Sequence, residues 1–80
     1  MKVIDIYTDS NGMIVSINDN GLVIHIDVYE SNGEITCDWN KYIFFDHNDY
    51  DQKVKTYQSN IDNFIKCSEL AIEAYEHETP

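Results

Sequence analysis

The chain has 80 residues and a formal net charge of −10, because 15 Asp and Glu stand against five Lys and no Arg. This length fits one domain, residues 1–80, and 42% hydrophobic residues are too many for a disordered chain. Phosphate binding needs Lys and Arg, so the charge excludes nucleic acid as a direct ligand. It favours a basic partner instead, including proteins that themselves bind nucleic acid.

Residues 3–7 and 13–17 are predicted to form the first two strands. Residues 22–30 alternate apolar and polar side chains, the period-2 pattern of a half-buried strand. One Asn-Gly pair precedes residues 13–17, a second precedes residues 22–30 and a third follows residues 22–30. Asn-Gly favours tight hairpin turns. Residues 35–39 are predicted as a fourth strand that continues or bends into 42–45. The first 45 residues therefore predict a four-stranded antiparallel meander.

Two-residue loops at the Asn-Gly pairs would fix which residues lie opposite each other. The pairs predicted for the inner face are all apolar: Ile6 with Ile17, Ile17 with Ile24, Val15 with Ile26, Met13 with Val28, Val28 with Cys37 and Ile26 with Trp39. On the outer face the same loops pair Tyr7 with Ser16, Asp27 with Asp38 and Tyr29 with Thr36. A wrong register by one residue would mix the two faces, so the consistency supports the meander.

From residue 46 the period changes to three and four, which predicts one long amphipathic helix over 48–76 with Asn48 as its N-cap. Its apolar stripe would cover the inner sheet face, giving an α+β fold. The predicted stripe is Tyr50, Val54, Tyr57, Ile61, Phe64, Ile65, Ser68, Ile72 and Tyr75. Cys67 is placed at the stripe's edge. A weakly apolar strip away from the core, a candidate surface for self-association or a partner, comprises Asn63, Cys67, Leu70 and Ala74.

The outer sheet face is the first candidate partner-binding surface. Its predicted residues are Asp5, Tyr7, Asp27, Tyr29 and Asp38. Like charges directly opposite each other destabilise a sheet, so the Asp27–Asp38 pair invites a functional reading. Carboxylates can stand in for phosphates, and Tyr is enriched at protein interfaces. The alternative is an ordinary solvated sheet face.

An acidic row on the predicted helix is the second candidate surface. Asp51, Asp62, Glu69, Glu73 and Glu76 share one narrow helical sector, and the last four are the candidate partner-binding residues. Successive carboxylates in its later part would lie roughly 5 to 10 Å apart along the axis, similar to phosphates along one DNA strand. Lys55 and Lys66 interrupt the row, and a solvated helix face is the alternative.

No catalytic, cofactor or metal motif is present in the sequence. His25, His47 and His77 share no ligand spacing, and the two cysteines, Cys37 and Cys67, have no C-x-x-C arrangement. We therefore expect a protein that is not an enzyme and needs no cofactor. The absence of a signal peptide and of an apolar run of membrane-spanning length predicts a cytoplasmic protein with no membrane partner.

In its size, its many carboxylates, its lack of Arg and its small sheet with a helix, the chain resembles phage-encoded inhibitors of bacterial defence. These are the anti-CRISPR proteins and the anti-restriction DNA mimics. The resemblance implies an acidic surface that occupies a basic nucleic-acid channel on a CRISPR effector, in the bacterial host cytoplasm. It transfers no role to any single residue. The alternatives are an immunity protein or antitoxin that neutralises a basic nuclease, and a homodimeric interaction domain.

Overall fold

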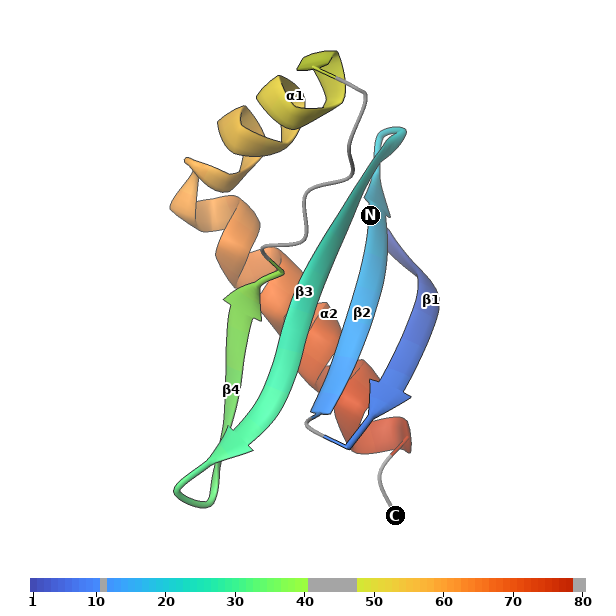
Figure 1. Cartoon of the computed structure of the whole chain (residues 1–80), viewed down its shortest axis with the longest axis vertical. Coiled ribbons are helices and arrows are strands. Elements are labelled where there is room, and N and C mark those ends of the chain that lie inside the picture. Colours follow the sequence, from blue (N-terminus) through green and yellow to red (C-terminus); the bar gives the residue numbers. More distant parts are fainter. Residues whose placement is uncertain (11, 41–47, 79–80) are drawn as a thin grey trace.

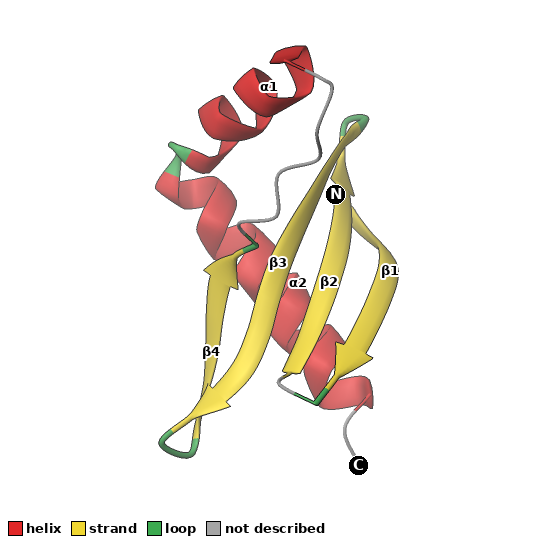
Figure 2. Ribbon diagram, in the orientation of Figure 1, coloured by secondary structure: helices red, strands yellow, loops and turns green. Residues whose placement is uncertain are grey.

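The computed structural model describes residues 1–10, 12–40 and 48–78, with only the backbone of 48–51. Within these ranges one sheet of four antiparallel strands, in the order β1-β2-β3-β4, is followed by two helices (Figure 1). The elements are β1 (Lys2–Asp9), β2 (Gly12–Asp19), β3 (Leu22–Ser31), β4 (Glu34–Trp39), α1 (Asn48–Gln58) and α2 (Ile61–Glu78). α2 crosses one face of the sheet (Figure 2). The predicted α+β class and meander are confirmed, while the continuation of the fourth strand into 42–45 lies outside the described residues.

The hairpins at both ends of β3 have the predicted turns. Asn20 and Gly21 have φ of 54° and 91°, and Asn32 and Gly33 have φ of 55° and 83°. Positive φ at both central residues is the type I′ requirement that Asn-Gly meets at low cost. The registers predicted from these two loops are confirmed, including Ile17 with Ile24, Val28 with Cys37, Asp27 with Asp38 and Tyr29 with Thr36.

The first hairpin has a different register from the predicted one. Ile6 lies opposite Val15 and Tyr7 opposite Ile14, so the pairings with Ile17 and Ser16 were wrong. Gly12 is already a strand residue opposite Asp9, whose Oδ1 accepts a hydrogen bond from the Gly12 N–H at 3.0 Å. From Asp5 to Asp9 the shift moves each partner by two residues and keeps these side chains on their predicted faces. The apolar pattern therefore could not distinguish the two registers.

A β-bulge between Val3 and Asp5 bends β1. It lets Val3 and Ile6 both pack on the core although they are three residues apart. Ile4, the extra residue, is 45% exposed. β1 thus has an irregular outer edge.

The long predicted helix is interrupted at Ser59 and Asn60, which separate α1 from α2. The Asn60 side-chain oxygen accepts a hydrogen bond from the Asp62 N–H at 3.0 Å, and its carbonyl accepts one from Asn63 N–H at 3.1 Å. Asn63 Nδ2 in turn donates to the Tyr57 carbonyl at the end of α1. Asn and Ser side chains compete with helical backbone bonds, so the chain uses this pair to end one helix and cap the next.

The interruption changes which face of α2 is buried. Cys67 and Ala71 are fully buried, and Leu70 and Ala74 pack at the margin of the core. The prediction that Cys67, Leu70 and Ala74 lie away from the core is therefore wrong. Ile61 and Ile65, predicted core residues, are 67% and 49% exposed. A new helix has its own phase, and small residues at its centre let α2 approach the sheet closely.

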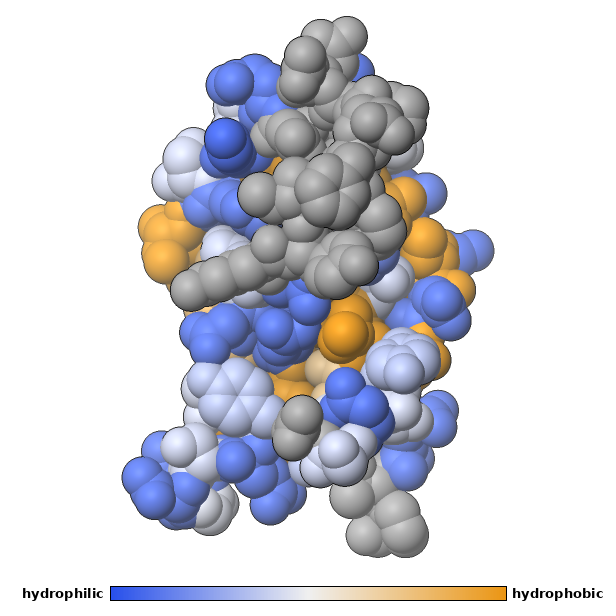
Figure 3. Space-filling model, in the orientation of Figure 1, coloured by the Kyte–Doolittle hydropathy of each residue, from blue (hydrophilic) through white to orange (hydrophobic). Residues whose placement is uncertain are grey.

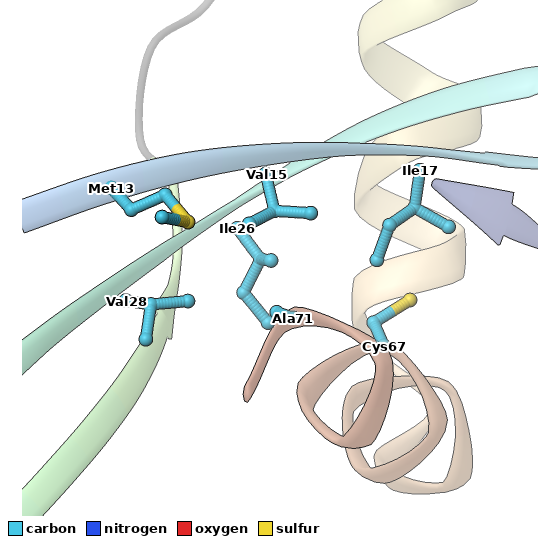
Figure 4. Close-up of a cluster of buried hydrophobic side chains, with 7 residues drawn as sticks. All are labelled: Met13, Val15, Ile17, Ile26, Val28, Cys67 and Ala71. Carbon is cyan, nitrogen blue, oxygen red and sulfur yellow. The ribbon is translucent and has the colours of Figure 1, made fainter. Parts of the chain in front are cut away.

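The core cluster shows this close approach (Figure 4). Cys67 and Ala71 of α2 meet the apolar inner face of β2 and β3. The buried cluster consists of Met13, Val15, Ile17, Ile26, Val28, Cys67 and Ala71. Trp39 was predicted to be substantially buried against the helix, and it is half-buried. It packs at the margin of the cluster, edge-on to Phe64 and Tyr57 with ring centroids 5.3 and 6.0 Å apart.

Candidate functional site on the outer sheet face

The face of the sheet opposite α2 carries its side chains in rows that run across the strands. One row is set by the three registers and consists of Tyr7, Ile14, Asp27 and Asp38. The next row on one side places Asp5, Ser16 and His25 together. All five predicted residues of this face are therefore on one surface, with Asp27, Tyr29 and Asp38 at β3 and β4 and Asp5 and Tyr7 across β2 on β1.

The paired carboxylates of Asp27 and Asp38 are each held by a neutral donor. Asn40 Nδ2 donates to Asp27 Oδ1 at 2.7 Å, and the Tyr29 hydroxyl donates to Asp38 Oδ2 at 2.5 Å. Each donor lies two positions along the chain from the carboxylate's direct partner, which is the diagonal neighbour position: Tyr29 is on β3, and Asn40 directly follows β4. The donors offset the like-charge repulsion without neutralising either carboxylate.

The hydrogen bond to Asp38 raises the pKa of the Tyr29 hydroxyl, with smaller contributions from burial and from the charges of Asp38 and Asp27. Tyr29 thus keeps its proton and directs it to Asp38. Its ring, rather than a free hydroxyl, is what it offers a partner. Tyr7 is 61% exposed and is the more open of the two predicted aromatic anchors.

Ser16 and His25 form a second pair that sequence reasoning missed. Ser16 Oγ lies 2.7 Å from His25 Nδ1, and Ser16 is only 9% exposed. Burial lowers the pKa of His25, and the nearby charges of Asp27 and Asp5 offset part of this shift. The incorrect first register had given Ser16 the wrong neighbour on β1. The β2–β3 loop alone, which places Ser16 opposite His25, contained the signal.

A shallow depression of about 350 Å³ lies beside the carboxylate pair on this face. Figure 3 shows a small hydrophobic patch near the middle of this face, with hydrophilic residues beside and below it. The depression is lined by Asp9, Gly12, Met13, Ile14, Asp27, Val28, Tyr29 and Asn40. Ile14 contributes an apolar side chain to this depression, and Asp9 and Asp27 contribute carboxylates. This combination fits a Lys or Arg side chain, whose methylene groups pack on apolar surface while the charge meets a carboxylate.

The acidic row on α2 is exposed, as predicted. Asp62, Glu69, Glu73 and Glu76 are all solvent-exposed, and Glu73 lies 4.0 Å from the His77 ring. α2 covers the inner face of the sheet, so this row and the outer sheet face lie on opposite sides of the molecule (Figure 2). The structure therefore does not unite the two predicted surfaces into one site.

In the described part of the chain, no helix is both long and apolar enough to cross a membrane. The same residues contain no group of three or more His, Cys, Asp or Glu placed to hold a metal ion. Cys37 and Cys67 are free thiols. Comparison with protein-family models, curated proteins and solved structures gives no match, so the chain's own residues are the basis for any functional argument.

Proposed function

We propose that this protein is a small, acidic, non-enzymatic inhibitor that binds a basic nucleic-acid-handling protein and blocks access of its nucleic acid. The observation that carries the proposal is the Asp27–Asp38 pair, held by Asn40 and Tyr29 beside an apolar depression. Carboxylates fixed in this way lose little side-chain freedom on binding, which favours affinity. The net charge of −10 supports the same kind of partner.

The outer sheet face is proposed as the binding surface in preference to the α2 row. Its carboxylates are oriented by hydrogen bonds, whereas Lys66 interrupts the row on α2. Lys or Arg residues that normally hold phosphates would meet Asp5, Asp27 and Asp38 instead. Because the charges attract over a distance, association should be fast and should slow as salt shortens the Debye length.

The first partner class to test is a CRISPR effector, whose nucleic-acid channel is basic. The second is a basic nuclease toxin, for which the chain would act as an immunity protein or antitoxin. The same face serves both, and binding to purified members of each class distinguishes them. A homodimeric interaction domain is the third candidate, and sedimentation analysis of the free protein tests it directly.

The decisive experiment compares two sets of isosteric substitutions. One variant carries Asp5→Asn, Asp27→Asn and Asp38→Asn, and Asn retains the oxygen that accepts the Asn40 and Tyr29 hydrogen bonds. The matched variant on the opposite side of the molecule carries Asp62→Asn, Glu69→Gln, Glu73→Gln and Glu76→Gln. Each is measured for displacement of fluorescent target DNA from a CRISPR effector–guide complex.

We expect the sheet variant to displace DNA at least about tenfold less effectively, and the helix variant to behave like the parent. Circular dichroism checks that both variants remain folded. If both displace DNA as well as the parent, acidic mimicry is the wrong mechanism. If only the helix variant fails, the binding surface is the row on α2.

A further inference from the structure

We propose that the free edge of β4, together with exposed isoleucines of α2, binds an extended segment of a partner in which Lys or Arg alternates with apolar residues. The basic character of the segment rests on the proposed function. Docking by strand addition goes beyond it. Strand addition uses main-chain hydrogen bonds for affinity and alternate side chains for specificity.

β4 has an edge that is ready for pairing. Among the described residues its neighbour in the sheet is β3 alone. The Asn40 N–H donates to the His25 carbonyl at 3.0 Å, which identifies this opposed pair as a hydrogen-bonded one. Hydrogen-bonded and non-hydrogen-bonded pairs alternate along an antiparallel ladder. Ile35, Cys37 and Trp39 therefore direct their backbone N–H and C=O groups away from β3.

Isoleucines of α2 lie on the β4 side of the helix. Ile61 and Ile65 are 67% and 49% exposed, and Ile72 falls in the same helical sector. The adjacent sector faces β4, because Phe64 packs edge-on against Trp39 with ring centroids 5.3 Å apart. Side chains on the inner face of an added strand would therefore meet these isoleucines.

The opposite edge of the sheet is less suitable for pairing. β1 carries the bulge between Val3 and Asp5, and Lys2 lies near its start. Bulges and edge lysines are two ways in which proteins block strand addition. β4 has neither feature along Glu34–Trp39, and its register with β3 is regular.

Charge determines which occupant fits this edge. Side chains on the outer face of an added strand would lie next to Thr36 and Asp38, and Asp38 already faces Asp27. A Lys or Arg at that position gains an opposite-charge cross-strand contact. A second copy of the chain would instead bring another Glu34, another Asp38 and a further net charge of −10. The edge therefore suits a basic segment and not a second copy.

The first test uses a capped synthetic peptide of alternating Lys and Val, titrated into the isotope-labelled full chain. We expect backbone amide shifts and slowed hydrogen exchange at Ile35, Cys37 and Trp39. A peptide with the same residues in two blocks lacks the alternation and should bind about tenfold more weakly. Shifts confined to the outer sheet face, or equal binding of both peptides, would overturn the proposal.

The second test compares two lysine substitutions at isoleucines of similar exposure. Ile65→Lys places a like charge in the path of the peptide, while Ile4→Lys, at a position 45% exposed in the native chain, lies on the β1 edge. Ile65→Lys should weaken peptide binding about tenfold and Ile4→Lys should leave it unchanged. Ile35→Pro removes an edge donor without removing a ladder bond, and should reduce binding similarly.

The two proposals can fail separately. Loss of DNA displacement in the Asp5, Asp27 and Asp38 variant with full displacement by Ile65→Lys would retain the inhibitor function and reject strand addition to the partner. Peptide binding at β4 without any displacement of DNA would retain the edge site and reject the inhibitor function. Dimerisation that disappears in Ile65→Lys would show that the occupant is a second copy, contrary to the proposal.

Discussion

Tyr57 on α1 donates a hydrogen bond from its hydroxyl to Asp19 Oδ2 at the end of β2, across an O–O distance of 2.9 Å. The same hydroxyl oxygen lies 3.3 Å from the Cys67 sulfur on α2. Because the only hydroxyl proton goes to Asp19, the Cys67 S–H is the donor in the second contact. α1, α2 and the sheet are thus joined at one half-buried point.

Tyr57→Phe should lower the free energy of unfolding by about 1 to 2 kcal/mol, the cost of leaving partly buried polar partners unsatisfied. The edge-on contact of the ring with Trp39 is retained, so packing changes little. Urea denaturation measures the change. Tyr7→Phe is the matched control, because Tyr7 is 61% exposed and its substitution should leave stability nearly unchanged. Equal effects of the two substitutions would contradict a structural role for the Tyr57 hydroxyl.

Stability should fall as pH rises through the range in which free thiols and phenols ionise. Burial raises the pKa of Cys37, where the Ser68 hydroxyl offsets part of the effect, and of Cys67; burial and its hydrogen bonds raise the pKa of Tyr57. Groups with a raised folded-state pKa stabilise fully below their unfolded pKa values, about 8.5 and 10, and this contribution is lost as pH increases toward the folded values.

Denaturation series between pH 7 and pH 11 measure this slope. Cys67→Ala removes one of the three groups and should flatten the early part of the curve, apart from its uniform loss of packing. A stability that stays constant through pH 10 would show that these groups ionise as readily in the folded chain as in the unfolded one.

Gly12 should tolerate substitution worse than the turn glycines. It has φ of 154°, and an added Cβ would lie 2.4 Å from the Val28 carbonyl oxygen. Gly21, with φ of 91°, has no atom within 4 Å of such a Cβ. Gly21→Ala should therefore cost only backbone strain, about 1 kcal/mol, whereas Gly12→Ala should cost about 2 kcal/mol or more. Thermal unfolding of the two variants compares them, and equal losses would contradict the close approach at Gly12.

Most of the sheet could be predicted because its signals are local. Asn-Gly turns fix φ and register at once, and each pairing around β3 followed from them. The register of the first hairpin was predicted wrongly because a shift of two residues preserves the faces. By this criterion Ile6 pairs equally well with Val15 or Ile17. In the observed register the Gly12 N–H donates a hydrogen bond to the Asp9 carboxylate. Hydrophobic periodicity does not indicate this contact.

The helical part was harder to predict because one short interruption changed which face of the following helix is buried. By residue type, Ser59 and Asn60 would also suit the surface of a continuous helix. Only the hydrogen bonds of Asn60 and Asn63 show that α1 ends and α2 begins at this point. The predicted apolar stripe continued the same helical phase across this break. It therefore placed Ile65 in the core, where the structure has Cys67. The donors that hold Asp27 and Asp38 were also missed, because diagonal contacts across strands depend on side-chain conformation.

His25 should titrate below the range of an unperturbed histidine, because burial lowers its pKa. A group with a lowered folded-state pKa stabilises fully above its unfolded pKa, about 6.5, and this contribution is lost as pH falls toward the folded value. Ring proton shifts in NMR spectra of the folded and urea-unfolded chain give the two midpoints. His25→Gln should remove this part of the pH dependence, which begins as pH falls below about 6.5. Coincident midpoints would mean that the ring is effectively solvated.

Asn60→Ala tests whether the interruption between α1 and α2 is held by the cap. The substitution removes the side-chain oxygen that accepts from the Asp62 N–H at 3.0 Å, and loss of an Asn N-cap typically costs about 1 kcal/mol. Asn60→Asp keeps an acceptor at the positive end of α2 and should retain most of the stability. Denaturant unfolding compares the two variants. Because Ala also favours helix, a stability of Asn60→Ala equal to the parent's would mean that α1 and α2 can join into one helix without loss, and that the cap does not determine where α2 begins.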